Sequence, residues 1–220
     1  MMNQSLQGIG MTSRRTRERM VNRLIEQGIR NRKVLDVMRD LPRHIFVDEA
    51  LASRAYEDNP LPIGYNQTIS QPYIVARMTE LLLKQGNLTK VLEIGTGCGY
   101  QTAILAQFAE HVYTVERILP LQRKAKEHLW DLKIKNVSFI HNDGGWGWPE
   151  YAPFDGVLVS AAPPEIPEPL LEQMAVGGMM VIPIGKPGSQ ELQRVTRTVN
   201  GYEIEEFEAV SFVPFLPGRE

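Results

Sequence analysis

The chain has 220 residues, 43% of them hydrophobic and 23% charged, which is enough apolar material for one sizeable core. A formal net charge of −2 argues against nucleic acid as a partner, and a single cysteine excludes an intrachain disulfide. No apolar run approaches the roughly 18 residues of a membrane span, and no signal-peptide pattern opens the chain. We therefore expect a cytoplasmic protein that binds neither nucleic acid nor membrane. We also expect a monomer.

The start of the chain predicts a helical attachment, residues 13–58, to a single domain that spans residues 1–220. Residues 1–12 carry no periodicity, so we expect them to be frayed. Ser13 is placed to cap a first helix, and Asn31 to cap a second. The expected elements are helices over about 13–28 and 31–42, and a short helical connection over 43–56.

A proline-rich stretch beginning at residue 59 predicts a loop that reaches residue 72. Ser70 stands where the N-cap of the next helix belongs, and Pro72 suits its first turn. The apolar residues that follow recur at helical spacing, and Gly86 ends the pattern.

From residue 90 the pattern changes to short apolar runs that alternate with amphipathic segments. This alternation predicts a Rossmann-like α/β fold with a mixed, mostly parallel sheet and helices on both faces. Near the C-terminus, Asn200-Gly201 between two alternating runs predicts an antiparallel hairpin with a type I′ turn. The expected strands are 91–94, 112–115, 137–140, 156–159 and 179–182, the expected helices 101–109, 119–132 and 167–175, and the hairpin strands 193–199 and 202–209.

Three glycines at alternate positions, Gly95, Gly97 and Gly99, lie between a predicted strand and a predicted helix. Without Cβ atoms the backbone can turn tightly and lie against a ligand, with free N–H groups facing it. The G-x-G-x-G spacing differs from the G-x-G-x-x-G of dinucleotide sites, so it argues against an NAD-dependent oxidoreductase. It favours a nucleoside with an amino-acid tail, whose ammonium group Glu93 could help to hold.

Two further acids fall at the ends of the next two strands. Glu116 is placed to accept both ribose hydroxyls, and Asp143, followed by Gly144, to bind the exocyclic amine of adenine. Because the carboxyl ends of parallel strands meet at one edge, the three features together predict an S-adenosylmethionine site.

Neither a metal nor a cysteine nucleophile is predicted. The four histidines show no ligand spacing. Cys98 has no nearby histidine or lysine in the sequence that would activate a thiolate, so we expect a small residue near the cofactor.

Over residues 13–217 the chain resembles the protein-L-isoaspartate O-methyltransferases. The resemblance rests on residues 61–64, 68–72, 91–101, 115–117, 154–156, 161–163, 177–178 and 212–214. It implies transfer of a methyl group from S-adenosylmethionine to the free α-carboxylate of isoaspartyl residues in damaged proteins and peptides, with Ser70 as the active-site hydroxyl. Cys98 stands where serine is common in the family, and Asn142 where glycine is common.

The implied site has two parts. The cofactor-binding residues are expected to be Thr68, Ile69, Ser70, Glu93, Gly95, Thr96, Gly97, Cys98, Gly99, Glu116, Arg117, Asp143 and Gly144. The substrate-binding residues are expected to be Ile63, Gly64, Ala161, Ala162, Pro163 and Val213.

Other functions stay open at this point. The chain could methylate a different small-molecule or protein carboxylate, or a nucleic acid, although the charge balance disfavours the last. It could also be a module that binds S-adenosylmethionine without catalysis, against which the intact Ser70 loop argues.

Overall fold

The computed structural model describes residues 10–86 and 88–220. Its N-terminal part is helical, as predicted, and Asn31 caps the second long helix by accepting hydrogen bonds from the backbone N–H groups of Lys33 and Val34 at 3.1 and 3.3 Å. Ser13 occupies the N-cap position of the first, but its side chain makes no capping hydrogen bond. The elements are η1 (Gly10–Thr12), α2 (Arg14–Glu26), α3 (Arg32–Asp40), η2 (Arg43–Phe46) and η3 (Glu49–Arg54). The rest of the segment expected to be frayed, residues 1–9, lies outside the described residues.

A seven-stranded sheet forms the centre of the molecule, in the order β5-β4-β3-β6-β7-β8-β9. The first five of these strands are parallel, and β8 and β9 add the predicted antiparallel hairpin at one edge. The strands are β3 (Leu88–Ile94), β4 (Ala109–Glu116), β5 (Val137–His141), β6 (Phe154–Val159), β7 (Met174–Lys186), β8 (Ser189–Thr198) and β9 (Gly201–Val210). The predicted mixed, mostly parallel sheet is confirmed.

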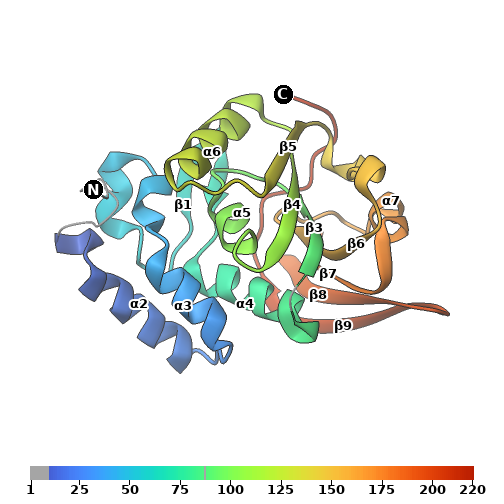
Figure 1. The fold of residues 1–220 in the computed structure, drawn as a ribbon, viewed down its shortest axis with the longest axis horizontal. Coiled ribbons are helices and arrows are strands. Elements are labelled where there is room, and N and C mark those ends of the chain that lie inside the picture. Colours follow the sequence, from blue (N-terminus) through green and yellow to red (C-terminus); the bar gives the residue numbers. More distant parts are fainter. Residues whose placement is uncertain (1–9, 87) are drawn as a thin grey trace.

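Helices cover both faces of the sheet, as expected (Figure 1). One face packs against α4, α5 and α6, with α2 and α3 outside them, and the other packs against α7. The elements are α4 (Pro72–Leu82), η4 (Leu83–Gln85), α5 (Tyr100–Leu105), α6 (Leu119–Asp131), η5 (Gly144–Trp146), η6 (Pro149–Tyr151) and α7 (Glu168–Glu172). The helices predicted over 101–109 and 167–175 are shorter than expected. Residues 106–108 form a turn that leads directly into β4, and β7 already begins at Met174. Within the described part of the chain, no helix has the length and apolarity to span a bilayer.

A small antiparallel hairpin, β1 (Leu61–Gly64) and β2 (Gln67–Ile69), replaces most of the loop predicted between residues 59 and 72. Its turn residues Tyr65 and Asn66 both have positive φ, 53° and 55°, as a type I′ turn requires. Of the prolines that indicated a loop, Pro60 precedes β1 and only Pro62 lies within it, on a strand with a single neighbour, where proline is tolerated on the outward-facing side.

The prediction of a type I′ turn at Asn200-Gly201 is wrong. Thr198 pairs with Gly201, so the central turn residues are Val199 and Asn200, and neither has a positive φ. Gly201 instead begins β9 with a φ of 144°. The hairpin therefore forms as expected, but with its turn one residue earlier.

Candidate functional site

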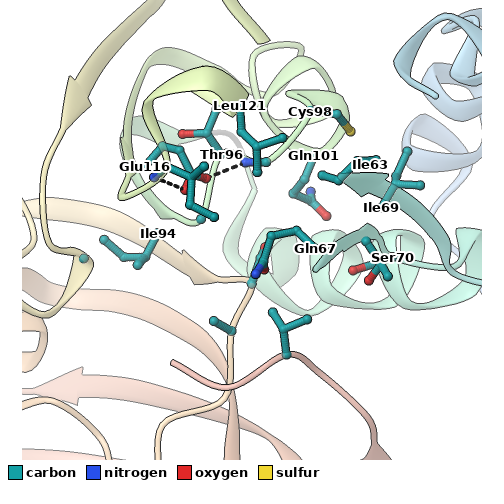
Figure 2. Close-up of a pocket in the computed structure, with 18 of the residues that line it drawn as sticks. Ile63, Gln67, Ile69, Ser70, Ile94, Thr96, Cys98, Gln101, Glu116 and Leu121 are labelled. Atoms are coloured by element: carbon teal, nitrogen blue, oxygen red, sulfur yellow. Dashed lines mark hydrogen bonds between the residues drawn. The ribbon is translucent and has the colours of Figure 1, made fainter. Parts of the chain in front are cut away.

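A cavity of about 950 Å³, partly open to solvent, lies at the carboxyl ends of β3, β4 and β6. The β1–β2 hairpin and the segment after β9 close it from the other side. Figure 2 shows Glu116 at one end and Ser70 at the other, with Gln67 and Gln101 between them. This volume suits a small-molecule ligand, and the location is where open α/β sheets bind theirs.

The glycine-rich turn after β3 serves two purposes. Gly95 and Gly97 line the cavity with φ values of 92° and 55°, which favour glycine at both positions. Gly99 does not line the cavity: a Cβ there would lie 2.9 Å from a Leu129 methyl group and 3.0 Å from Cβ of Ala125. The third glycine therefore allows α5 to pack closely against α6.

Glu116 is held rigidly at the end of β4. Its Oε2 accepts a hydrogen bond from the Gly97 N–H at 2.8 Å, and its Oε1 accepts one from the Ile118 N–H at 2.9 Å. Each carboxylate oxygen retains a lone pair that could accept a ribose hydroxyl. Burial raises the pKa of the Glu116 carboxyl, while these backbone donors oppose the rise. The hydrogen bond between them holds the glycine-rich turn and the Glu116 carboxylate at the same end of the cavity, where both can contact one nucleoside.

Glu93, expected to hold the amino-acid tail, lies behind the cavity and is fully buried. Its Oε2 accepts hydrogen bonds from the hydroxyls of Thr102 and Thr114, both at 2.6 Å. Thr114 is in turn hydrogen-bonded to Thr96, which lines the cavity, at 2.6 Å. Burial raises the pKa of Glu93 to about 8. Glu93 thus supports the cavity wall through two threonines.

Cys98 lines the cavity, and burial raises the pKa of its thiol to about 11. Its carbonyl accepts a hydrogen bond from His128 Nδ1 at 2.9 Å, so this histidine braces the backbone of the turn. A thiol that stays protonated at neutral pH is a poor nucleophile, in keeping with the packing role expected for it.

Asp143, expected at the adenine edge, is absent from the cavity lining. Its Oδ1 accepts from the Gly145 N–H at 2.8 Å, and its Oδ2 accepts from the Gly218 N–H in the C-terminal segment at 2.6 Å. Gly144 does line the cavity, and a Cβ there would lie 2.4 Å from a methyl group of Ile94. The acid thus fixes the turn and the chain end, while the glycine permits close approach.

Ser70 lies between the end of β2 and Gln71, which is the N-cap residue of α4. The prediction that Ser70 itself is the N-cap is therefore wrong by one residue. Ser70, Thr68 and Ser160 line both the large cavity and a smaller groove beside it. Three hydroxyl-bearing residues thus lie where the cavity meets the groove.

The loop after β6 contributes to the site in two ways. Ala161 and Val213 line the cavity. Ala162 makes two backbone hydrogen bonds to the C-terminal segment. Its N–H donates to the Val213 carbonyl at 2.9 Å, and its carbonyl accepts from the Phe215 N–H at 3.0 Å. The Pro163 carbonyl accepts from the Gly185 N–H at 3.0 Å. Ala162 and Pro163 therefore fix the loop through backbone hydrogen bonds, and Ala161 and Val213 form part of the cavity wall.

Most of the predicted site residues meet in this cavity. Those of the expected cofactor set that line it are Thr68, Ile69, Ser70, Gly95, Thr96, Gly97, Cys98, Glu116, Arg117 and Gly144, and those of the expected substrate set are Ile63, Ala161 and Val213. The structure does not bring Glu93, Gly99, Asp143, Gly64, Ala162 or Pro163 into the lining.

Several lining residues were not predicted, among them Gln67, Gln101, Ser160 and Phe215. Ser160 carried a usable signal, because it directly follows β6 at the same sheet edge as the glycine turn. In residues 10–86 and 88–220, no group of three or more His, Cys, Asp or Glu side chains is arranged to hold a metal.

The sheet order, the glycine-rich turn after β3 and the carboxylate that ends β4 together define an S-adenosylmethionine-dependent methyltransferase. Comparison with known proteins gives the family. The sequence profile of the protein-L-isoaspartate(D-aspartate) O-methyltransferase (PCMT) family matches residues 15–220, and the chain belongs to this family.

Relatives agree with this placement. The chain is 61% identical over 211 residues to protein-L-isoaspartate O-methyltransferase 1 of Nitrosococcus oceani, covering 94% of this chain and 99% of the relative. It is 58% identical over 212 residues to the protein-L-isoaspartate O-methyltransferase of Halorhodospira halophila, covering 96% of each.

Solved structures agree as well. A protein-L-isoaspartate O-methyltransferase superposes with a TM-score of 0.81 at 26% identity, over 90% of this chain and 65% of that one. A Plasmodium falciparum structure described as a beta-aspartate methyltransferase in complex with S-adenosyl-L-homocysteine superposes with a TM-score of 0.78 at 26% identity, over 90% of this chain and 96% of that one.

Proposed function

We propose that the chain repairs damaged proteins by transferring the methyl group of S-adenosylmethionine to the free α-carboxylate of L-isoaspartyl residues. Its family membership and the names of its relatives support this substrate. The observation that carries the proposal is the junction of cavity and groove, where the hydroxyl-bearing residues Thr68, Ser70 and Ser160 line both.

The groove favours a carboxylate over an amine or alcohol as the methyl acceptor. Its described lining holds no titratable side chain. An alcohol or a protonated amine would need a general base there, whereas a carboxylate with a pKa of about 4 is already ionised at neutral pH. The hydroxyls can orient such a carboxylate without removing a proton from it.

We assign the roles as follows. Glu116 and the glycine-rich turn would hold the nucleoside, and bound S-adenosylmethionine supplies the methyl group from its sulfonium. Ser70 would donate a hydrogen bond to one oxygen of the acceptor carboxylate and leave the other oxygen free to form the new O–CH₃ bond, while the S–CH₃ bond breaks and S-adenosylhomocysteine leaves as the neutral thioether. The β1–β2 hairpin and the C-terminal segment, which wall the cavity, would limit the access of water to the reacting groups. In-line positioning contributes about 7–11 kcal/mol when geometry is good.

The test uses two synthetic peptides that differ only in isoaspartate or aspartate at one site. We expect methylation of the isoaspartyl peptide alone, as an ester that releases methanol in mild alkali. Equal labelling of both peptides, or alkali-stable label, contradicts the proposal. Binding of S-adenosylhomocysteine without turnover would instead identify a non-catalytic module.

Ser70 is tested separately with Ser70→Ala. Loss of a hydrogen bond to a charged group should lower kcat about 10- to 150-fold, while affinity for S-adenosylhomocysteine changes little. Ser53→Ala, on exposed η3, is the matched control. A variant in which only cofactor affinity changes would remove Ser70 from the substrate side.

A further inference from the structure

Arg43, in η2, is the largest fully buried side chain of the described residues. No salt bridge among residues 10–86 and 88–220 involves it. A buried cation without a carboxylate partner is costly, and large apolar side chains would fill such a site at lower cost. The presence of arginine there calls for an explanation beyond packing.

The contacts of Arg43 join the two sides of the active-site cavity. Its Nη2 donates a hydrogen bond to the backbone carbonyl of Ser70 at 2.7 Å, and its Nε donates to the carbonyl of Ala55 at 2.7 Å. Its guanidinium carbon lies 4.7 Å from the ring centroid of Tyr100, the first residue of α5 and part of the cavity lining. The same group therefore touches the segment that carries Ser70 and the helix that follows the glycine-rich turn.

We propose that Arg43 is a positioning residue for the methyl transfer, which fixes the Ser70 hydroxyl relative to the cofactor end of the cavity by holding the Ser70 carbonyl. Ser70 lies outside both β2 and α4, so its placement depends on such contacts. Misplacing a reacting group by about 1 Å can lower a rate about 100-fold. This inference rests on the proposed function, because it concerns the hydroxyl assigned there to the acceptor carboxylate.

Arginine suits this role better than lysine does. Its planar fork can bond two carbonyls in fixed directions while its face lies on an aromatic ring, whereas an ammonium group is a single point charge on a flexible stem. Arg43 Nη1 is buried without a hydrogen-bond partner, so the fork is not fully used by the surrounding backbone.

The test is a double-mutant cycle between Arg43→Lys and Ser70→Ala, with isoaspartyl peptide as substrate. Rates are normalised to the number of sites that bind S-adenosylhomocysteine in calorimetry, so that partial unfolding does not count as lost catalysis. We expect Arg43→Lys to lower kcat about 10-fold or more in the wild-type background but less than about twofold in the Ser70→Ala background, since residues that act as a unit are non-additive. The affinity for S-adenosylhomocysteine should stay within about threefold.

Arg23→Lys is the matched control. Arg23 Nη2 donates to the carbonyl of Tyr56, next to Ala55, at 2.7 Å, but no hydrogen bond of Arg23 reaches Ser70. We expect its kcat to stay within about twofold of wild type. Arg43→Gln, which lacks the charge, provides a second variant and should lose at least as much kcat per binding site as Arg43→Lys.

The outcomes separate the two proposals. If the wild-type chain does not methylate the isoaspartyl peptide, the proposed function fails. If it does, the inference is overturned by an unchanged kcat in Arg43→Lys, by an equal loss in both Ser70 backgrounds, or by an equal loss in Arg23→Lys. Full activity in Arg43→Lys with a loss in Arg43→Gln would show that charge acts rather than the fork.

Discussion

Replacing Glu116 with alanine tests the cofactor site because this side chain has two separable duties. It faces the cavity, and it accepts hydrogen bonds from the N–H groups of Gly97 and Ile118 at 2.8 and 2.9 Å. Alanine removes both the acceptor for ribose and the acceptors for these two donors. We therefore expect losses of ligand affinity and of stability.

The affinity loss follows from the charge of the lost acceptor. Hydrogen bonds to a charged group contribute about 1.5–3 kcal/mol, which corresponds to an increase of about 10- to 150-fold in the dissociation constant of S-adenosylhomocysteine. Both ribose hydroxyls are assigned to this one carboxylate.

The stability loss comes mainly from Ile118, whose hydrogen bond to Glu116 is buried, whereas the hydrogen bond from Gly97 is only partly buried, so its N–H is more accessible to solvent. An unsatisfied buried donor costs about 1–3 kcal/mol, and for a chain of this size each kcal/mol shifts Tm by about 2–4 °C. Relief of the desolvation that raises the pKa of Glu116 offsets part of this cost. A fall in Tm of about 2–10 °C is expected.

Calorimetric titration with S-adenosylhomocysteine and thermal unfolding of the ligand-free protein measure the two effects. Glu110→Ala, exposed at the other end of β4, is the control and should change neither. Unchanged affinity in Glu116→Ala would refute the ribose assignment. A lower affinity with an unchanged Tm would refute the reasoning about the turn.

Two further predictions follow from buried titratable groups. Because burial raises the pKa of Glu93 to about 8, the folded protein retains a proton that the unfolded chain releases near pH 4.5, so stability falls as pH rises between these values. Glu93→Gln removes this dependence. Denaturant unfolding at pH 5, 6.5 and 8 should show that the wild type loses several kcal/mol of unfolding free energy relative to the variant as pH rises. The same change of unfolding free energy with pH in both proteins would contradict this prediction. Because burial raises the pKa of the Cys98 thiol to about 11, iodoacetamide should label the folded protein at pH 8 far more slowly than the unfolded chain, and Cys98→Ser should retain activity. Rapid labelling, or an inactive serine variant that still binds S-adenosylhomocysteine, would show a role for the thiol beyond packing.

The sheet and its ligand edge were predictable from sequence because their signals are local and periodic. Apolar runs define the parallel strands, and Glu116 ends the second of them, as the strand boundary shows. The β1–β2 hairpin was missed because its strands are short and contain a proline, and because Tyr65 is an uncommon residue for a turn with positive φ. Arg43 gave no signal, because its contacts are to carbonyls, which every residue has.

Within the predicted site, residue type and position were easier to foresee than the direction of each side chain. Asp143 and Glu93 are each adjacent in sequence to a residue that lines the cavity, yet the side chain of each bonds to groups outside the lining. Asp143 bonds to backbone N–H groups of Gly145 and Gly218, and the second of these lies 75 residues away. Such a partner depends on where the chain end returns, and no local pattern encodes that.

The glycine-rich turn requires glycine for two different reasons. Its alternate spacing reads as one ligand-binding feature, but only Gly95 and Gly97 face the cavity, and Gly99 makes room for Leu129 of α6. Substitution at Gly99 should therefore act first on the packing of α5 against α6, and only through that packing on ligand binding. A ligand-facing glycine and a packing glycine are indistinguishable in sequence because both are selected for the same missing Cβ. What separates them is the neighbour that a Cβ would meet, and that neighbour is supplied by the rest of the fold.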